Sequence, residues 1–176
     1  MKRLFLTLTS LALAAGSYGA DRQPKVEDRP VILDKANVYP LCLDDSIQFR
    51  KTINFLNDPE LNKPSFDDMI NFERLRVNFG AVQGYERRQR YGNYFTFYWR
   101  TKRPADLTLR FEYRQQNLGA HVQARELYYK GVKGSVTSRF NIVADDYNDD
   151  GKVTGWRAIL IENGKIVALN QSFLWN

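Results

Sequence analysis

The stretch DDYNDDGK has the residue types and spacing of a calcium loop. Asp146, Asn148 and Asp150 alternate and Gly151 follows, which matches the first half of the motif D-x-[DN]-x-[DN]-G, in which oxygen ligands converge on Ca²⁺. Counted from Asp146, the twelfth residue is Arg157, where an EF-hand needs a bidentate glutamate, so an EF-hand is excluded. Two interpretations stay open: a calcium-stabilised loop between strands, with Asp146, Asn148 and Asp150 as ligands, or an acidic turn in solvent.

Residues that could carry out catalysis are scarce. The chain has one histidine, His121, and one cysteine, Cys42, so a multi-histidine metal centre and an internal disulfide are excluded. We expect His121 to be exposed on a strand and Cys42 to be a buried thiol, with a bridge between chains as the alternative. Glu112 and Glu126 are expected on neighbouring strands, where they could form the carboxylate pair of a glycoside hydrolase. The sequence favours a protein that is not an enzyme.

A binding surface has more support. In NYFTFYWRT, Tyr94, Tyr98 and Arg100 share one face of a predicted strand, and Tyr85 and Tyr91 lie just before it. Such residues can form a flat aromatic platform with a cationic end, which suits a glycan or a peptide. The predicted binding residues are therefore Tyr94, Tyr98 and Arg100. The alternative is that the tyrosines cover another layer or simply favour strand structure.

The elements that position these residues are predicted to be strands. In DLTLRFEYR, apolar and polar residues alternate, as a half-buried antiparallel strand requires, with Leu107, Leu109, Phe111 and Tyr113 toward the core. Its other face is expected to be wet: Thr108, Arg110, Glu112 and Arg114. NYFTFYWRT and SVTSRFNIVA alternate in the same way, ERLRVNF and AHVQARELYY add two further segments, and glycines such as Gly131 and Gly134 are expected at turns. The count is about seven strands, including a C-terminal hairpin.

That hairpin lies in WRAILIENGKIVALNQSFLW. Asn163 and Gly164 supply the two positive-φ residues of a type I′ turn, which places Glu162 opposite Lys165. The register that follows pairs Leu160 with Val167, Ala158 with Leu169, and Thr154 with Phe173. Apolar residues on both faces predict a covered hairpin.

Short strands at this spacing predict an all-β fold, a single antiparallel β-sandwich of about seven strands, with a small β-barrel as the alternative. The spacing of the last two predicted strands resembles that of an immunoglobulin-like or fibronectin-like sandwich. The resemblance implies the fold alone, because the core cysteine pair of such domains is absent.

The N-terminus predicts export. Lys2 and Arg3 precede the uncharged run Leu4–Ala15, and small residues follow at Ser17 and Gly19, which is the layout of a secretory signal peptide over residues 1–19. The run is too short to span a bilayer, so we expect no integral membrane segment after cleavage. An uncleaved anchor is the alternative.

The remaining chain divides into a proline-rich lead-in, residues 20–64, and the β-sandwich domain, residues 65–176. The lead-in contains one ordered element, SIQFRKTINFL, whose pattern fits a strand or a helix. A short helix is expected to begin near Ser65, because Asp68 three residues later completes a capping box.

Charge limits the partners. The net charge of +6 falls to +4 when Lys2 and Arg3 leave with the signal peptide. Dense basic clusters occur only in ERRQR and WRTKR. We interpret them as solvated strand ends and loops that keep a sheet soluble; the alternative is an anionic partner such as a polysaccharide, a lipid headgroup or an acidic protein, and nucleic acid is not expected. We therefore expect an exported, non-catalytic module of the periplasm, envelope or extracellular space that binds a glycan, a peptide or an envelope protein. The alternatives are a small outer-membrane β-barrel and a sandwich glycoside hydrolase.

Overall fold

The computed structural model describes residues 30–35, 37–58 and 66–175. The predicted signal peptide and the first part of the lead-in lie outside these ranges, as does Ser65 of the predicted helix cap. Expectations for those segments stay predictions.

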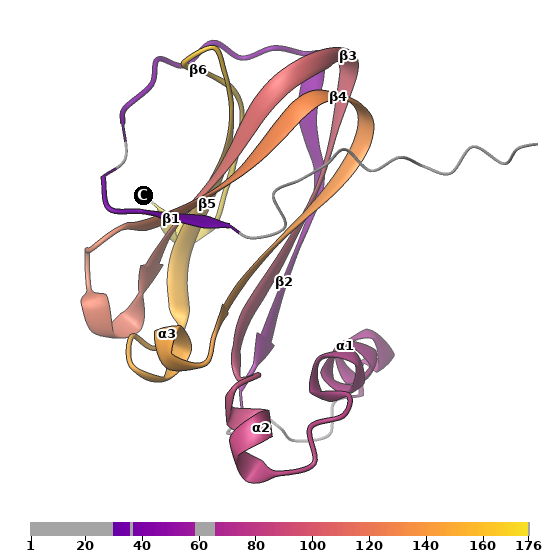
Figure 1. Ribbon diagram of the computed structural model, residues 1–176, viewed down its shortest axis with the longest axis vertical. Helices are drawn as coiled ribbons and strands as arrows, with labels where there is room; N and C mark the ends of the chain where they lie inside the picture. The colour runs from indigo at the N-terminus through magenta and orange to yellow at the C-terminus, as the bar shows by residue number, and fades with distance from the viewer. Residues whose placement is uncertain (1–29, 36, 59–65, 176) are drawn as a thin grey trace, which may run out of the picture.

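Six strands of the described residues form one sheet in which every ladder is antiparallel (Figure 1). The strands are β1 (Val31–Leu33), β2 (Ile47–Asn57), β3 (Gly92–Gln115), β4 (Gln123–Val143), β5 (Val153–Glu162) and β6 (Lys165–Gln171). The helical segments are α1 (Asp68–Asn78), α2 (Gly84–Arg88), η1 (Gln116–Leu118), α3 (Asp145–Asn148) and η2 (Phe173–Trp175). The strand order is β1-β4-β3-β5-β6, with β2 paired to β3, which confirms an all-β, antiparallel protein.

Two strands are much longer than the sequence suggested. β3 has 24 residues and β4 has 21. Each of them joins two of the predicted strands, and together they form one long hairpin. Gly131 and Gly134, expected at turns, lie inside β4 with φ of 60° and 95°, opposite the irregular pairing between Thr101 and Leu107. These glycines let the ribbon bend without reversing direction.

The bend folds β3 over itself and encloses the core. The rings of Phe95 and Phe111 lie 4.7 Å apart, although 16 residues of straight strand would separate them by about 50 Å. The alternation had predicted the buried face correctly in both halves of the strand: Phe95, Phe97, Trp99, Leu107, Leu109, Phe111 and Tyr113. Phe140 and Ile142 of β4 and Leu160 of β5 complete this core.

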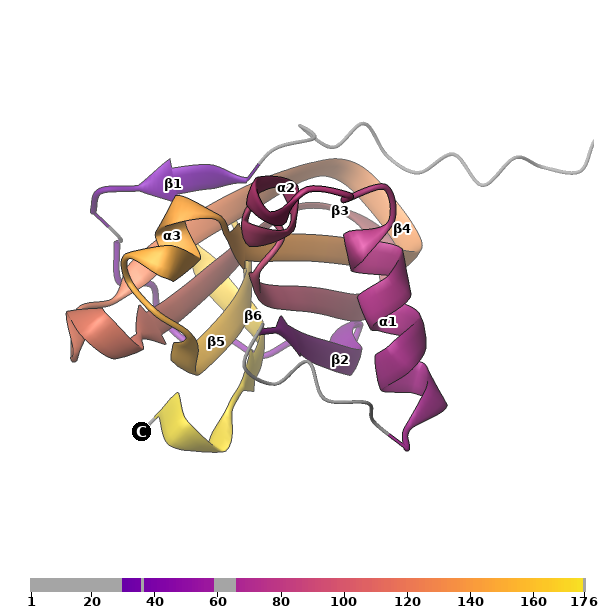
Figure 2. The same ribbon diagram turned by 90° about the horizontal axis from the view of Figure 1, so that it is seen from below.

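The two outer strands of the curled sheet approach each other. The first half of β3 pairs with β2 and the second half with β5, and β6 follows β5. Asn170 Nδ2 on β6 donates a hydrogen bond to Thr52 Oγ1 on β2 at 2.7 Å. No backbone ladder joins β2 to β6 among the described strands, so the sheet is curled and not closed (Figure 2).

The segment ERLRVNF, predicted as a strand, is part of a helix. α1 begins at Asp68, and the side chain of the N-cap residue Asp67 accepts a hydrogen bond from Met69 N at 2.9 Å. A capped start and helix-favouring Glu, Leu and Arg residues outweigh the weak alternation of this segment. Of the described helices, none is long and apolar enough to cross a bilayer.

The ambiguous segment SIQFRKTINFL forms β2, and a bulge explains its mixed pattern. Phe49 pairs with Trp99 and Lys51 with Tyr98, so Arg50 is the extra residue of the bulge. The bulge changes the face of every later side chain. Phe49 packs against the core, whereas Phe55 lies opposite Tyr94 on the outer face.

The turn of the C-terminal hairpin is confirmed. Asn163 and Gly164 have φ of 49° and 71°, and Glu162 pairs with Lys165.

The predicted register beyond the turn is wrong. Leu160 lies opposite Ala168, not Val167, and Ala158 lies opposite Asn170, not Leu169. The pairing shifts between Leu160 and Ile161, which leaves Val167 in a bulge where it and Ala168 are both buried. Phe173, predicted opposite Thr154, belongs to η2.

The turn predicts the effect of a matched pair of glycine substitutions. Gly164→Ala should lower the free energy of unfolding by about 1 kcal/mol, because an L side chain resists this positive φ. Gly84→Ala in α2 is the control, since no atom lies within 4 Å of its added Cβ. Denaturant unfolding should show the control to be neutral or stabilised. Equal losses in the two variants would contradict the turn.

Candidate functional site

The outer face of the half-sheet formed by β2, the first half of β3 and the second half of β4 holds two of the three predicted binding residues. The strand register places Tyr98 between Lys51 and Thr137, and Arg100 between Gln48 and Ser135. Directly opposed residues share a face, so these side chains project together. Tyr98 is half-buried and Arg100 is exposed.

Two further cations belong to this face, and the sequence reasoning missed both. Lys51 is exposed beside Tyr98, and Arg139 is exposed opposite Thr96, one pair farther along β3. The described residues of these strand stretches, 47–57, 92–101 and 134–143, contain no Asp or Glu. We call Lys51, Tyr98, Arg100 and Arg139 the basic face. The signal that could have found the two cations was the strand interpretation of SIQFRKTINFL, together with the pairing of its neighbours.

Tyr94, the third predicted binding residue, has structural contacts. Its hydroxyl donates a hydrogen bond to Arg90 O at 2.7 Å, and its ring lies 6.2 Å from that of Phe55. Burial raises the pKa of Tyr94 to about 12. Tyr85 lies in α2 and Tyr91 precedes β3, so neither is a member of the strand face.

A group of charged side chains expected on the wet side of the sheet is buried. Arg110, Glu112 and Glu126 are only 3%, 5% and 6% exposed. Arg110 Nε donates to Glu126 Oε1 at 2.6 Å, and Arg157 Nε donates to Glu112 Oε2 at 2.9 Å. The expectation of a wet face at Arg110 and Glu112 is therefore wrong, and the cause is cover from both ends of the described chain.

The cover comes from the lead-in and from η2. Asn37 O accepts a hydrogen bond from Arg110 Nη1 at 2.7 Å, and the Tyr39 ring lies 5.0 Å from the same guanidinium. On the other side, the Trp175 ring lies 5.1 Å from the Arg157 guanidinium. A buried charge needs such partners to replace water.

This arrangement bears on the glycoside hydrolase alternative. Glu112 and Glu126 do come from neighbouring strands, and Arg110 lies between them, 4.0 Å from Glu112 Oε1. A glycosidase needs one carboxyl group that stays protonated and reaches the substrate. Both carboxylates here contact arginines under a covered surface, which supports a structural role.

The two residues considered for nucleophilic chemistry lie on different segments. His121 is exposed, as predicted, but it lies just before β4 and not on a strand as expected. Cys42 is exposed, so the expectation of a buried thiol is wrong. Its segment is fixed by the backbone, since Cys42 N donates to Ile166 O at 2.8 Å, and the side chain points away from the core.

The acidic loop is a helical turn with protein partners. Asp146 Oδ2 accepts from Arg125 Nη2 at 2.5 Å, and Gln115 Nε2 donates to the carbonyl oxygens of Asp146 and Gly151. Gln123 Nε2 lies 3.3 Å from Asp150 Oδ2. Within the described part of the chain, no cluster of three or more His, Cys, Asp or Glu side chains is arranged to hold a metal.

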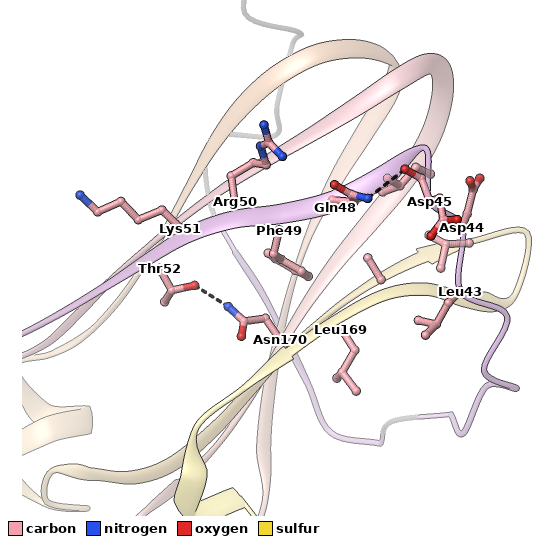
Figure 3. Close-up of a pocket in the computed structure, with 13 residues that line it drawn as sticks. Leu43, Asp44, Asp45, Gln48, Phe49, Arg50, Lys51, Thr52, Leu169 and Asn170 are labelled. Carbon is pink, nitrogen blue, oxygen red and sulfur yellow. Dashed lines mark hydrogen bonds between the residues drawn. The ribbon is translucent and has the colours of Figure 1, made fainter.

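An open groove of about 510 Å³ separates β2 from β6 (Figure 3). Phe49 forms part of its wall, and its ring packs edge-on against Phe97 at 6.1 Å. At one end of the groove, hydrogen bonds from Ser46 and from the Arg103 guanidinium lower the pKa of Asp44 to about 2. The groove is crossed by the bond between Thr52 and Asn170, which Figure 3 shows as a dashed line.

The buried charges predict a large effect from one substitution. Arg110→Met should lower the free energy of unfolding by about 3 kcal/mol or more, because Glu126 would be left buried without its cation. Arg139→Met, an exposed arginine on the same sheet, should change it by less than about 0.5 kcal/mol. Adding Glu126→Met to Arg110→Met should recover part of the loss in a denaturant titration. No recovery would mean that lost packing, and not the uncompensated charge, is responsible.

The calcium hypothesis for Asp146, Asn148 and Asp150 stays a prediction that thermal unfolding tests. If the loop binds Ca²⁺, the millimolar ion should raise the melting temperature and a chelator should reverse the rise, because the ion stabilises only the folded state. Asp150→Asn should weaken this response. A melting curve that Ca²⁺ does not move would contradict the hypothesis and leave Arg125 as the counter-charge of Asp146.

No protein-family model, curated protein or solved structure matches the chain. Its function must therefore be argued from the geometry of its own residues.

Proposed function

We propose that this chain is an exported, non-catalytic β-sandwich module that binds an acidic polysaccharide through the basic face. The observation that carries the proposal is the outward projection of Lys51, Arg100 and Arg139 around Tyr98, on stretches of β2, β3 and β4 (residues 47–57, 92–101 and 134–143) that contain no Asp or Glu. Export rests on the predicted signal peptide, and the periplasm, the envelope and the extracellular space are the compartments where such a polymer is met.

The two-layer interpretation of the fold rests on the bend in the long hairpin. Phe95 and Phe97, on the first half of β3, contact Phe111 on its second half. The two halves of the sheet thus face each other across one core, as the layers of a sandwich do. Each layer then has an outer face, and the basic face occupies the outer face of the first.

The chemistry of the basic face suits a polyanion with sugar rings. Exposed arginine and lysine side chains attract carboxylate or sulfate groups through interactions that salt weakens. The half-buried ring of Tyr98 offers an apolar surface on which a sugar can stack.

The proposal predicts selective binding to dextran sulfate over neutral dextran. The triple variant Lys51→Gln, Arg100→Gln, Arg139→Gln should bind dextran sulfate at least tenfold more weakly, and added salt should weaken wild-type binding. Tyr98→Ala should also reduce affinity, with little change in melting temperature. Affinity electrophoresis or calorimetry would measure these differences.

A control variant separates the basic face from net charge. Lys35→Gln, Lys130→Gln, Lys165→Gln removes three exposed positive charges from other parts of the surface. We expect it to bind within about twofold of the wild type. An equal loss in both triple variants, or equal binding to neutral dextran, would contradict a specific site.

A further inference from the structure

The helix α1 is oriented with apolar side chains toward solvent. Met69, Phe72 and Leu75 are 65%, 61% and 73% exposed, and no residue of this helix is buried. Their spacing of three residues places them along one side of the helix. Phe66 before the helix and Phe79 after it are also exposed, so the stripe continues beyond both ends.

The C-terminal end of α1 is held by polar contacts. Asn57, fully buried at the end of β2, exchanges side-chain hydrogen bonds of 3.1 and 3.2 Å with Asn78. Arg90 donates to the carbonyl oxygens of Val77 and Phe79. These bonds satisfy the carbonyl groups that a helix leaves free at its C-terminal end. The orientation is therefore fixed by specific contacts that keep the apolar stripe outside.

Figure 2 shows that α1 lies at the outside of the sheet, beside β2. The exposed fractions of Met69, Phe72 and Leu75 show that no described element covers the apolar stripe. A contiguous exposed apolar surface of this kind marks an interaction with a partner or a membrane.

Charge around the stripe favours one partner. Arg76 lies on the same side of α1, one turn after Phe72; its side chain is 47% exposed and pairs with Glu73 Oε2 at 2.6 Å. Arg87 and Arg88 are exposed on α2, which follows the stripe. Carboxylates are also present: Asp67 and Asp68 lie at the N-terminal end, where the helix dipole stabilises them.

We propose that α1 docks on an anionic lipid bilayer, with Met69, Phe72 and Leu75 in the interface and the arginines at the headgroups. Separate apolar side chains on a convex helix enter lipid without needing a shaped partner, and long arginine side chains reach the headgroup layer. This surface contains none of the residues of the basic face, so the proposal stands or falls independently of polysaccharide binding.

A second copy of the chain fits the stripe less well. An 11-residue helix is only about 16 Å long, which gives less contact area than a stable dimer requires. A symmetric pairing would also bring Arg76, Arg87 and Arg88 of two copies together.

Vesicle flotation with the full chain tests the proposal. Wild type should float with vesicles of phosphatidylglycerol and phosphatidylcholine, and bind several-fold less to phosphatidylcholine alone. The variant Met69→Gln, Phe72→Gln, Leu75→Gln should lose at least tenfold in affinity for the anionic vesicles. Because these side chains are exposed, its melting temperature should stay within a few degrees of the wild type.

The matched control is Ile32→Gln, Val38→Gln, Leu43→Gln, which changes three exposed apolar residues of the lead-in. It should bind anionic vesicles as the wild type does. Equal binding by the α1 variant would show that another segment, such as the run Leu4–Ala15, carries the attachment, and would overturn the proposal.

Two further measurements complete the test. An environment-sensitive dye at Phe72→Cys, in a Cys42→Ser background, should shift to the blue on addition of anionic vesicles, and the same dye at Val38→Cys should not. Sedimentation should show a monomer without lipid. A stable dimer that the α1 variant abolishes would assign the stripe to self-association and overturn the lipid proposal.

Discussion

The fold depends on the bend in the β3–β4 hairpin. One 24-residue strand supplies core side chains from both halves of the bent sheet, and it can do so only because it folds back on itself near Thr101–Leu107. Because of the bend, the free edge of β3 pairs with β2 along its first half and with β5 along its second half. These pairings determine the strand order and leave the sheet open between β2 and β6. The bend also separates two outer faces with different chemistry. The basic face lies on the outer side of the first half of β3, and the buried ion pairs lie on the outer side of its second half.

Residues on both sides of β5 are buried, so the outer face of this half of the sheet is covered. Leu160 faces the core, and Ile159 and Ile161 on the reverse side are also excluded from water. Arg110 and Glu112 share that reverse side, so both charges are removed from water. Arg110 pairs with Glu126, and Glu112 pairs with Arg157. Segments that enter and leave the domain therefore pack over charged strand residues. Breaking one ion pair removes a partner that no water can replace.

Alternation in the sequence predicted which side chains of β3 and β4 form the core, and the Asn163-Gly164 pair predicted the last turn. The sequence could not predict the bulges, because one extra residue at Arg50 or Val167 changes the strand register without changing the composition. The sequence also did not show that four of the predicted short strands form two long ones, because a glycine such as Gly131 can bend a strand as well as end it.

The candidate site shows the same limit. Tyr98 and Arg100 were identified because they lie two residues apart on one strand, a purely local relation. Lys51 and Arg139 reach the same face through pairing with β3, and pairing is a tertiary property that a single strand does not encode. Tyr94 satisfies the same local pattern, yet its hydroxyl is engaged by Arg90 O, a contact that exists only because α1 and α2 lie between β2 and β3.

The arrangement of α1 follows from what the end of β2 presents to it. A helix that packs on a sheet normally turns its apolar side inward, because burying that surface stabilises the fold. Here the end of the strand offers Asn57, and Arg90 offers a guanidinium, so the inner contacts are polar and are satisfied by Asn78 and by helix carbonyl groups. Rotating α1 to bury Phe72 would leave these hydrogen-bonding groups without partners. The polar contacts therefore favour the orientation in which the apolar stripe is exposed.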